Sequence, residues 1–320
     1  MGIVFMGTPE FAALPLELLM QNHADVIAVY TQPDKSSGRG RGVTASPVKK
    51  VALNWGLPVY QPLNFKSVEE KDRLKALQPD VIIVAAYGQI LPGAVLELPR
   101  YGCLNMHPSL LPRYRGVSPI PAAILNGDEF TGISIMKLDE GVDTGPVLAQ
   151  AQVMITDWDT TGLVTEKLSR IGAQLLLEIL PRWSGGKITP RTQDNSRANY
   201  TRMLDKGVGE IDWTQPAVNI WRQVRAYQPW PSSHTRWQGK QLKIIEAVPI
   251  DAQSGTPGLV VQLSVSKGFG VETGLGILGI IRVQMEGKRI IASDEFLRGQ
   301  RQLIGSVLPV RQEGAQIGNS

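Results

Sequence analysis

The sequence contains a single cysteine among 320 residues. One thiol cannot form a disulfide framework or a thiolate metal cluster, and such cysteine usage is typical of a reducing compartment, here expected to be the cytoplasm. No apolar run approaches the ~20 residues that span a bilayer, so a membrane is not an expected partner. After the first predicted strand the chain has Gly7-Thr8-Pro9 in place of Gly-x-Gly-x-x-Gly, which disfavours a nicotinamide dinucleotide.

Hydrophobic content of 42% and charged content of 19% are typical of a globular protein, and 320 residues predict two domains. Residues 1–200 carry 19 basic and 19 acidic side chains, whereas residues 201–320 carry 14 and 10. The whole positive excess therefore lies in the last third. A mildly basic domain suits a polyanionic partner, although small basic domains without such a partner share the pattern.

Hydrophobic patterning divides the chain. Strands at 3–6, 26–31 and 80–86 alternate with helical segments, which predicts a Rossmann-like, mostly parallel sheet in an α/β domain over residues 1–186. Two of its helices are expected to begin at Thr8 and Ser46 as N-caps, each followed by proline. Residues 187–206 are polar and predict a linker. Short β-rich runs separated by turn signals over 207–320 predict a small antiparallel barrel or sandwich, and we expect an OB-like β-barrel.

The stretch from residue 102 to 116 is the first candidate site. Residues 103–107 are predicted to form a strand, on which Asn105 and His107 share one face. Ligands bind at the carboxyl ends of strands in parallel α/β sheets, and a Pro-bounded loop with Pro108, Pro112 and two arginines follows. For either residue alone a structural role is the simpler interpretation, but the pair at a strand end indicates a reactive site.

An acidic turn, residues 139–145, is the second candidate. It follows a predicted strand at 131–138 and holds three acids among glycines. One interpretation is a solvated turn. The other places one carboxylate opposite His107 at a neighbouring strand end, where it would hold the imidazole's tautomer and charge.

The segment 32–47 is rich in Gly, Ser and Pro, with arginines at 39 and 41, and is predicted to be a long loop. It is either a solvated loop or a cationic arm that orders on a polyanion.

Several motifs together resemble the formyltransferases that use 10-formyltetrahydrofolate. The resemblance covers residues 2 to about 308. The motifs are Gly7-Thr8-Pro9-Glu10-Phe11-Ala12, Gln32-Pro33-Asp34, Ser46-Pro47-Val48-Lys49, Ala86-Tyr87-Gly88, Asn105-Met106-His107, Ser109-Leu110-Leu111-Pro112, Arg113-Tyr114-Arg115-Gly116, Asp139 to Gly145 and Pro229-Trp230-Pro231. The arginine loop and the basic β-domain separate the chain from members that act on nucleotide precursors. With these two features the chain resembles the branch that acts on charged tRNA.

This resemblance implies that a formyl group passes from 10-formyltetrahydrofolate to the amino group of methionine esterified to initiator tRNA. The chemistry requires no metal, and the enzyme is expected to be a monomer. The implied catalytic residues are Asn105, His107 and Asp143. Asn105 and a protonated His107 would stabilise an oxyanion, and Asp143 would receive a proton. The implied folate contacts are Ser109, Leu110, Leu111, Pro112, Tyr87 and Gly88. Arg39 and Arg41 are expected to bind tRNA.

Two departures from the family pattern lie beside the site: Tyr114 stands where tryptophan is common, and Pro121 replaces a glutamine.

Two other functions remain open on the sequence. The same three residues could serve a related formyltransferase or a formyltetrahydrofolate hydrolase with a small acceptor. Alternatively, the chain could bind nucleic acid with an inert α/β domain. The arginine loop argues against the first, and the intact Asn105, His107 and Asp143 argue against the second.

Overall fold

The computed structural model describes residues 1–37, 42–253, 255–263 and 268–309. The chain packs as two units, and both are discontinuous in sequence. The first unit comprises Met1–Ile120, Glu129–Ile155 and Leu163–Arg202, and the second comprises Pro121–Asp128, Thr156–Gly162 and Met203–Ser320.

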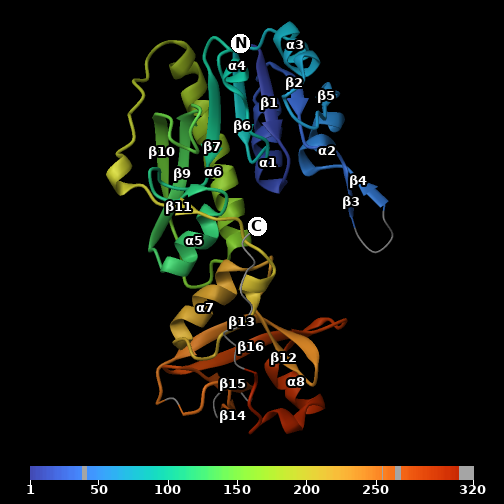
Figure 1. The fold of residues 1–320 in the computed structure, drawn as a ribbon, viewed down its shortest axis with the longest axis vertical. Coiled ribbons are helices and arrows are strands. Elements are labelled where there is room, and N and C mark those ends of the chain that lie inside the picture. Colours follow the sequence, from blue (N-terminus) through green and yellow to red (C-terminus); the bar gives the residue numbers. More distant parts are fainter. Residues whose placement is uncertain (38–41, 254, 264–267, 310–320) are drawn as a thin grey trace. The chain divides into compact units, whose positions relative to one another are not determined.

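The first unit is built on a seven-stranded sheet with the order β10-β9-β7-β6-β1-β2-β5 (Figure 1). The central strands β1 and β6 are continuous apolar runs that are buried along their whole length, as expected for strands covered on both faces. Four neighbouring pairs, which join five strands, are parallel, and this confirms the predicted Rossmann-like, mostly parallel α/β class. The strands are β1 (Ile3–Gly7), β2 (Val26–Tyr30), β5 (Val59–Tyr60), β6 (Val81–Ala85), β7 (Cys103–His107), β9 (Phe130–Lys137) and β10 (Val147–Met154).

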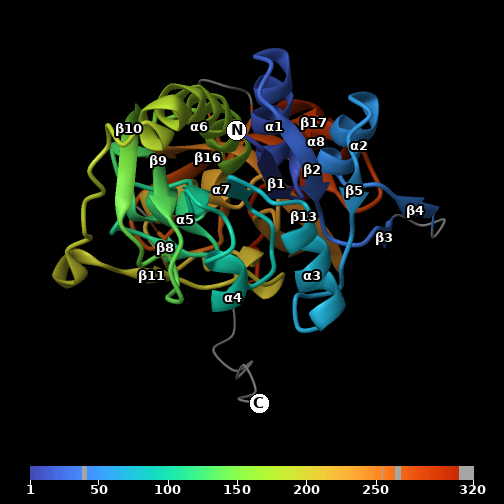
Figure 2. The same cartoon turned by 90° about the horizontal axis from the view of Figure 1, so that it is seen from above.

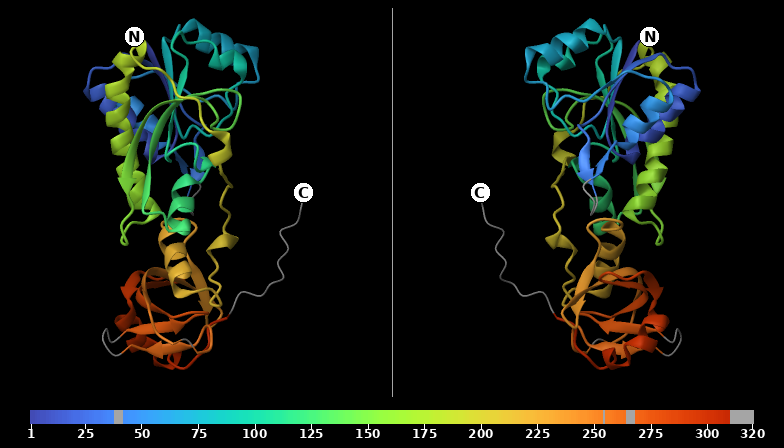
Figure 3. Two further views of the ribbon diagram at one scale, coloured as in Figure 1. Left: turned by 90° about the vertical axis from the view of Figure 1, so that its left-hand side faces the viewer. Right: turned by 90° about the vertical axis from the view of Figure 1, so that its right-hand side faces the viewer.

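Helices cover both faces of this sheet, as Figure 3 shows for α6 on one side and α3 on the other. On the α6 side, Ser169 Oγ donates to the Phe11 carbonyl of α1, and Gly172 approaches Met106 of β7. On the α3 side, Leu74 and Val95 share a core cluster with alternate residues of β1 and β6. The helices of this unit are α1 (Glu10–Gln21), α2 (Pro47–Asn54), α3 (Val68–Ala76), α4 (Gly93–Leu96) and α6 (Thr161–Ser184, from Leu163 onward). A further helix, α5 (Pro119–Asn126), belongs to the second unit from Pro121 onward.

The two predicted N-caps have different outcomes. Ser46 caps α2, because its Oγ accepts from the backbone N–H of Lys49 at 3.1 Å. The predicted cap at Thr8 is wrong: the N-cap is Pro9, and α1 begins at Glu10. The Thr8 hydroxyl is used elsewhere, since it donates to the Tyr87 carbonyl at 3.1 Å and accepts from the Gln32 N–H at 3.2 Å. It therefore links neighbouring strand ends instead of capping a helix.

The segment 32–47, predicted to be a loop throughout, contains a short antiparallel hairpin of β3 (Lys35–Ser37) and β4 (Gly42–Thr44). Its base is anchored to the sheet domain. Lys49 forms an ion pair with Asp34, and Gln61 donates to both Asp34 and the Gln32 carbonyl. These bonds hold the carboxylate in place and lower the pKa of Asp34 below its ordinary value, chiefly through the hydrogen bond from Lys49.

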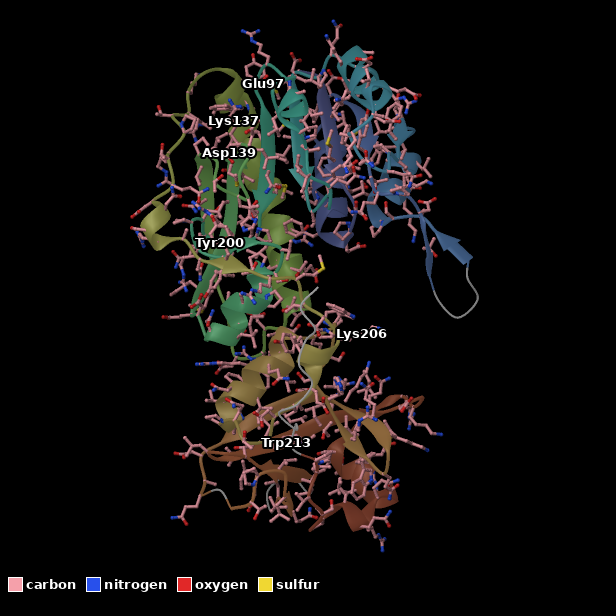
Figure 4. All side chains as sticks on the ribbon, in the orientation of Figure 1. Glu97, Lys137, Asp139, Tyr200, Lys206 and Trp213 are labelled. Atoms are coloured by element: carbon pink, nitrogen blue, oxygen red, sulfur yellow. The ribbon has the colours of Figure 1, made fainter. Side chains whose placement is uncertain are left out.

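The second unit contains a curled antiparallel sheet with the order β12-β13-β16-β15-β14, and β17 also pairs with β16. This agrees with the predicted small antiparallel barrel. Trp213, labelled in Figure 4, is fully buried in a core formed by the sheet, α7 and α8. The elements are α7 (Ala217–Ala226), β12 (His234–Trp237), β13 (Lys240–Ile250), β14 (Val260–Gln262), β15 (Phe269–Glu272), β16 (Ile277–Met285), β17 (Ile290–Ala292) and α8 (Ser293–Gly299).

The segment predicted as a linker, 187–206, is structured up to residue 202 and packs with the first unit. Within it, β11 (Tyr200–Thr201) pairs in parallel with β8 (Arg115–Gly116). Figure 2 shows these two short strands side by side. Short 3-10 turns occur at Asn195–Arg197, Gly207–Gly209 and Arg301–Leu303. Within the described ranges, none of the helices combines the length and apolar character that a bilayer span requires.

Candidate active site

The strand β7 brings two of the predicted residues to one place. Side chains alternate along a strand, so Asn105 and His107 leave the same face while Met106 packs toward α6. Both contact Asp143: Asn105 Nδ2 lies 3.4 Å from Asp143 Oδ1, and His107 Nδ1 lies 3.5 Å from Asp143 Oδ2. The structure therefore gathers an amide donor, an imidazole and a carboxylate, which is a set suited to oxyanion stabilisation and proton transfer.

Asp143 does not reach this point from a neighbouring strand end, as the sequence suggested. The strand β9 runs antiparallel to β7, so Lys137 at its carboxyl end lies opposite Leu104, near the start of β7. The turn after β9 brings Asp143 back to Asn105 and His107. A Cβ on Gly145 would collide with the Lys137 carbonyl, so only glycine fits there. Asp143 itself has φ +53, a conformation that is uncommon outside glycine and is held by surrounding bonds.

The two carboxylate oxygens of Asp143 have different partners. Oδ1 faces Asn105, whereas Oδ2 faces His107 and also accepts from the backbone N–H of Gly116 at 2.8 Å. The side chain is about 15% exposed, whereas that of His107 is about 5% exposed. Of the two, the carboxylate is thus the group that a substrate atom can approach.

Both ring nitrogens of His107 face acceptors. Nε2 lies 2.9 Å from the Tyr114 carbonyl, which can only accept, so this nitrogen carries a proton and donates. Nδ1 faces the Asp143 carboxylate. The ring can therefore carry a proton on each nitrogen, with the positive charge balanced by Asp143. The departure at Tyr114 is compatible with this arrangement, because its backbone carbonyl makes the contact with the imidazole.

The loop after β7 is folded by internal hydrogen bonds. Ser109 is fully buried, and its Oγ donates to the Arg113 carbonyl at 2.6 Å. The Leu111 N–H donates to Ser134 Oγ, and the Leu111 carbonyl accepts from Gln150. The Ser109 side chain and the Leu111 backbone are thus used by the fold, and the Leu111 side chain is buried. Leu110 and Pro112 are partly exposed and are the side chains of this run that remain accessible.

The Tyr87-Gly88 edge follows β6, the neighbour of β7 in the sheet. The Tyr87 ring is buried against Phe65, and burial raises the pKa of its hydroxyl. Gly88 is exposed with φ +78, and its carbonyl accepts from Gln32 Nε2 at 2.9 Å.

Arg39 and Arg41, the residues expected to bind tRNA, lie outside the described residues. The second departure, Pro121, lies in α5 and packs with the second unit.

A group of side chains that no sequence pattern predicted surrounds this site. Arg115 is buried beside Gly116, and Gln193, Asn195, Asn199 and Tyr200 contact it or its neighbours. Figure 4 marks Tyr200 on β11. These partners are about eighty residues away in sequence and lie in a polar segment without periodicity, so no local pattern distinguished them from a linker.

Comparison with known proteins agrees with this architecture. Residues 1–180 match the family model for formyl transferase, and residues 203–301 match the model for the formyl transferase C-terminal domain. The match to the first model includes the strands that carry Asn105, His107 and the turn with Asp143. The protein is therefore an enzyme of the formyl transferase class.

The curated relatives are similar over nearly the whole chain. A methionyl-tRNA formyltransferase from Dehalococcoides mccartyi is 48% identical over 308 residues, covering 96% of this chain and 98% of the relative. One from Chloroflexus aggregans is 48% identical over 301 residues, covering 93% and 97%. The chain belongs to the methionyl-tRNA formyltransferase family.

More distant solved structures share the fold. A sugar 3N-formyl transferase, WlaRD, matches with a TM-score of 0.65 at 19% identity, covering 90% of this chain and 99% of that one. HypX from Aquifex aeolicus in complex with tetrahydrofolic acid matches with a TM-score of 0.62 at 18% identity, covering 92% and 46%. At this identity these similarities concern the fold.

Proposed function

We propose that this enzyme transfers a formyl group from 10-formyltetrahydrofolate to the free amino group of methionine esterified to initiator tRNA. The observation that carries the proposal is the convergence of Asn105 and His107 on Asp143 within 3.5 Å. It is supported by the relatives named methionyl-tRNA formyltransferase, which match nearly the whole chain. The formyltransferase family uses formyl-tetrahydrofolate, which identifies the class of donor. The proposal specifies the donor as 10-formyltetrahydrofolate, names the acceptor, and assigns roles to individual residues.

The roles follow from which atoms remain available. The reaction forms a bond between the methionyl nitrogen and the formyl carbon, breaks the bond from that carbon to folate N10, and moves a proton from the amine to N10. Asn105 Nδ2 carries two N–H groups; one is directed to Asp143, and the other can donate to the oxygen on which negative charge develops. Such a donor is typically worth ~2.7–4 kcal/mol in the transition state.

Asp143 receives the proton that the amine loses, directly or through a water, because a carboxylate has more acceptor positions than Asn105, Gly116 and His107 occupy. His107 contributes positive charge beside the reacting oxygen. It does not donate a hydrogen bond to that oxygen, since both of its nitrogens are directed to protein acceptors.

The folate is proposed to lie along the edge formed by Tyr87-Gly88 and residues Ser109 to Pro112. The buried side chains of Tyr87, Ser109 and Leu111 shape this edge, while exposed Gly88 and the partly exposed Leu110 and Pro112 make the contacts. Backbone groups at such an edge can recognise the polar rim of a pterin, and apolar side chains can pack on its faces.

Residues 1–186 are proposed to act as the catalytic domain, and residues 207–320, with their positive excess, to bind the tRNA. Arg39 and Arg41 are proposed to grip its acceptor end. A hairpin arm suits this task because its base is anchored by Asp34, Lys49 and Gln61 while its sequence is rich in glycine and arginine. The enzyme is proposed to work as a cytoplasmic monomer.

The direct test is an assay with the purified full-length protein, 10-formyltetrahydrofolate and initiator tRNA charged with methionine. Formylmethionyl-tRNA should accumulate, as measured by chromatography of the released amino acid, and one tetrahydrofolate should appear per product. Water alone, a nucleotide-linked amino sugar and charged elongator tRNA serve as competing acceptors. Formylation of the amino sugar, or hydrolysis of the folate, with no product on charged initiator tRNA would contradict the proposal.

A further inference from the structure

Arg115 is a buried cation within the first unit, with about 2% of its surface exposed. Its guanidinium makes four hydrogen bonds, and all go to uncharged groups. Nε and Nη2 donate to Gln193 Oε1 at 3.1 and 2.9 Å, Nη2 also donates to Asn195 Oδ1 at 2.8 Å, and Nη1 donates to the Tyr200 hydroxyl at 3.0 Å. Burying a guanidinium without a carboxylate partner is costly, and these bonds repay only part of the cost. The arrangement therefore calls for an explanation other than stability.

Gln193 connects this cation to the active site. While its Oε1 accepts from Arg115, its Nε2 donates to the carbonyls of Asp143 at 2.8 Å and Gly145 at 2.7 Å. The orientation of the amide is fixed by chemistry, because a guanidinium can only donate and a carbonyl can only accept. Arg115 thus sets the direction of the amide, and the amide clamps both ends of the tight turn that holds Asp143.

The same loop also holds the carboxylate of Asp143. Gly116, the residue after Arg115, donates its N–H to Asp143 Oδ2. Asn199 fixes this loop in turn: its side chain accepts from the Tyr114 N–H, and its carbonyl accepts from the Arg115 N–H. Asp143 is therefore held at its backbone by Gln193 and at its side chain by Gly116.

From this geometry we propose that Arg115 and Gln193 are positioning residues, which hold Asp143 in its positive-φ conformation with its carboxylate aimed at the reacting amine. The inference rests on the proposed function. Both side chains are buried and make their contacts with protein groups. They act through Asp143, so their loss should lower the rate of the chemical step and leave substrate binding unchanged.

Gln193→Glu separates positioning from stability. A glutamate keeps an acceptor oxygen for Arg115 and gives the cation a charged partner, but it cannot donate to the carbonyls of Asp143 and Gly145. We expect the denaturant midpoint to equal or exceed that of the wild type and kcat for formylation to fall at least about tenfold, because small displacements of a catalytic group are costly. The KM values for charged tRNA and for the folate should stay within about twofold.

Thr192→Ala is the matched control, since Thr192 is exposed in the same segment and its change should leave kcat, KM and stability as in the wild type. Arg115→Lys is a second variant. An ammonium cannot reproduce the paired bonds to Gln193, so kcat should again fall without a change in KM.

A wild-type kcat in Gln193→Glu, or a loss confined to KM, would overturn the inference. So would an equal loss of kcat in Thr192→Ala. If the wild-type enzyme itself does not formylate charged initiator tRNA, then the proposed function fails instead, and the two failures are distinguishable because the wild type is measured first.

Discussion

At the scale of single residues, the site depends on one carboxylate that the backbone carries into place. Asn105 and His107 are adjacent because alternate residues of a strand share a face, which is why a sequence pattern could find them. Asp143 joins them through a strained turn, and its position depends on bonds from Gly116 and Gln193. The reactive geometry is therefore only partly encoded in the strand.

Replacing Asp143 by asparagine tests its role directly. Asp143→Asn keeps an oxygen for Gly116 but removes the negative charge that balances His107 and the acceptor for the amine proton. We expect kcat to fall at least about 100-fold with tRNA affinity nearly unchanged, measured by single-turnover formylation and by filter binding.

Glu140→Gln is the matched control, because it removes the same charge from an exposed position of the same turn. Its kcat should stay within about twofold of the wild type. Equal activities of Asp143→Asn and wild type would remove the carboxylate from the mechanism.

At the scale of elements, burial decided what the sequence could predict. The bounds of buried strands such as β6 (Val81–Ala85) were predicted within a residue or two, because a short continuous aliphatic segment between turns is compatible with few structures other than a buried strand. The strand β12 (His234–Trp237), the helix α8 (Ser293–Gly299) and the β3–β4 hairpin were missed, since their sequences are polar or charged and lack an apolar period. Gln193 was missed for a related reason: its contact with Arg115 spans 78 residues.

The hairpin base gives an element-scale prediction. Asp34→Asn removes the ion pair with Lys49 and should lower the midpoint of thermal unfolding at pH 7 by about 2–4 °C, the shift expected for about 1 kcal/mol in a domain of this size. The folded-state pKa of Asp34 lies below its ordinary value of 3.8. The wild type's advantage should thus be complete above pH 3.8 and disappear as the pH falls through the lower folded value.

Scanning calorimetry of both proteins across this pH range would measure the difference. Glu97→Gln serves as a control for a carboxylate outside this cluster. A gap between Asp34→Asn and wild type that persists unchanged at the acid end would show that the ion pair with Lys49 is not its source.

At the scale of the whole molecule, the second unit is not a simple C-terminal appendage. It includes residues 121–128 and 156–162, and Arg225 of α7 donates to the Thr156 carbonyl at 2.9 Å while stacking 3.8 Å from the Trp221 ring. A cut after residue 202 would strip these segments of their partners. The contribution of the basic region to tRNA binding is therefore better measured in the full-length chain than in a truncation.

The last prediction uses that full-length chain. Because cations that contact phosphates release counterions, the logarithm of the affinity for initiator tRNA should fall linearly with the logarithm of salt concentration. Arg41→Ala should weaken binding and reduce the magnitude of this slope by about one, the change expected when one phosphate contact is lost. Folate affinity should stay the same, since the proposed folate edge is formed by other residues.

Arg73→Ala is the control, because Arg73 is already paired with Glu69 and Glu70 on α3 and has no proposed contact with tRNA. Its slope should match that of the wild type. Titrations at several salt concentrations decide the matter: an affinity that does not depend on salt would contradict binding through phosphates, and identical slopes for Arg41→Ala and Arg73→Ala would remove the hairpin arm from the tRNA contact while leaving the basic second unit as its source.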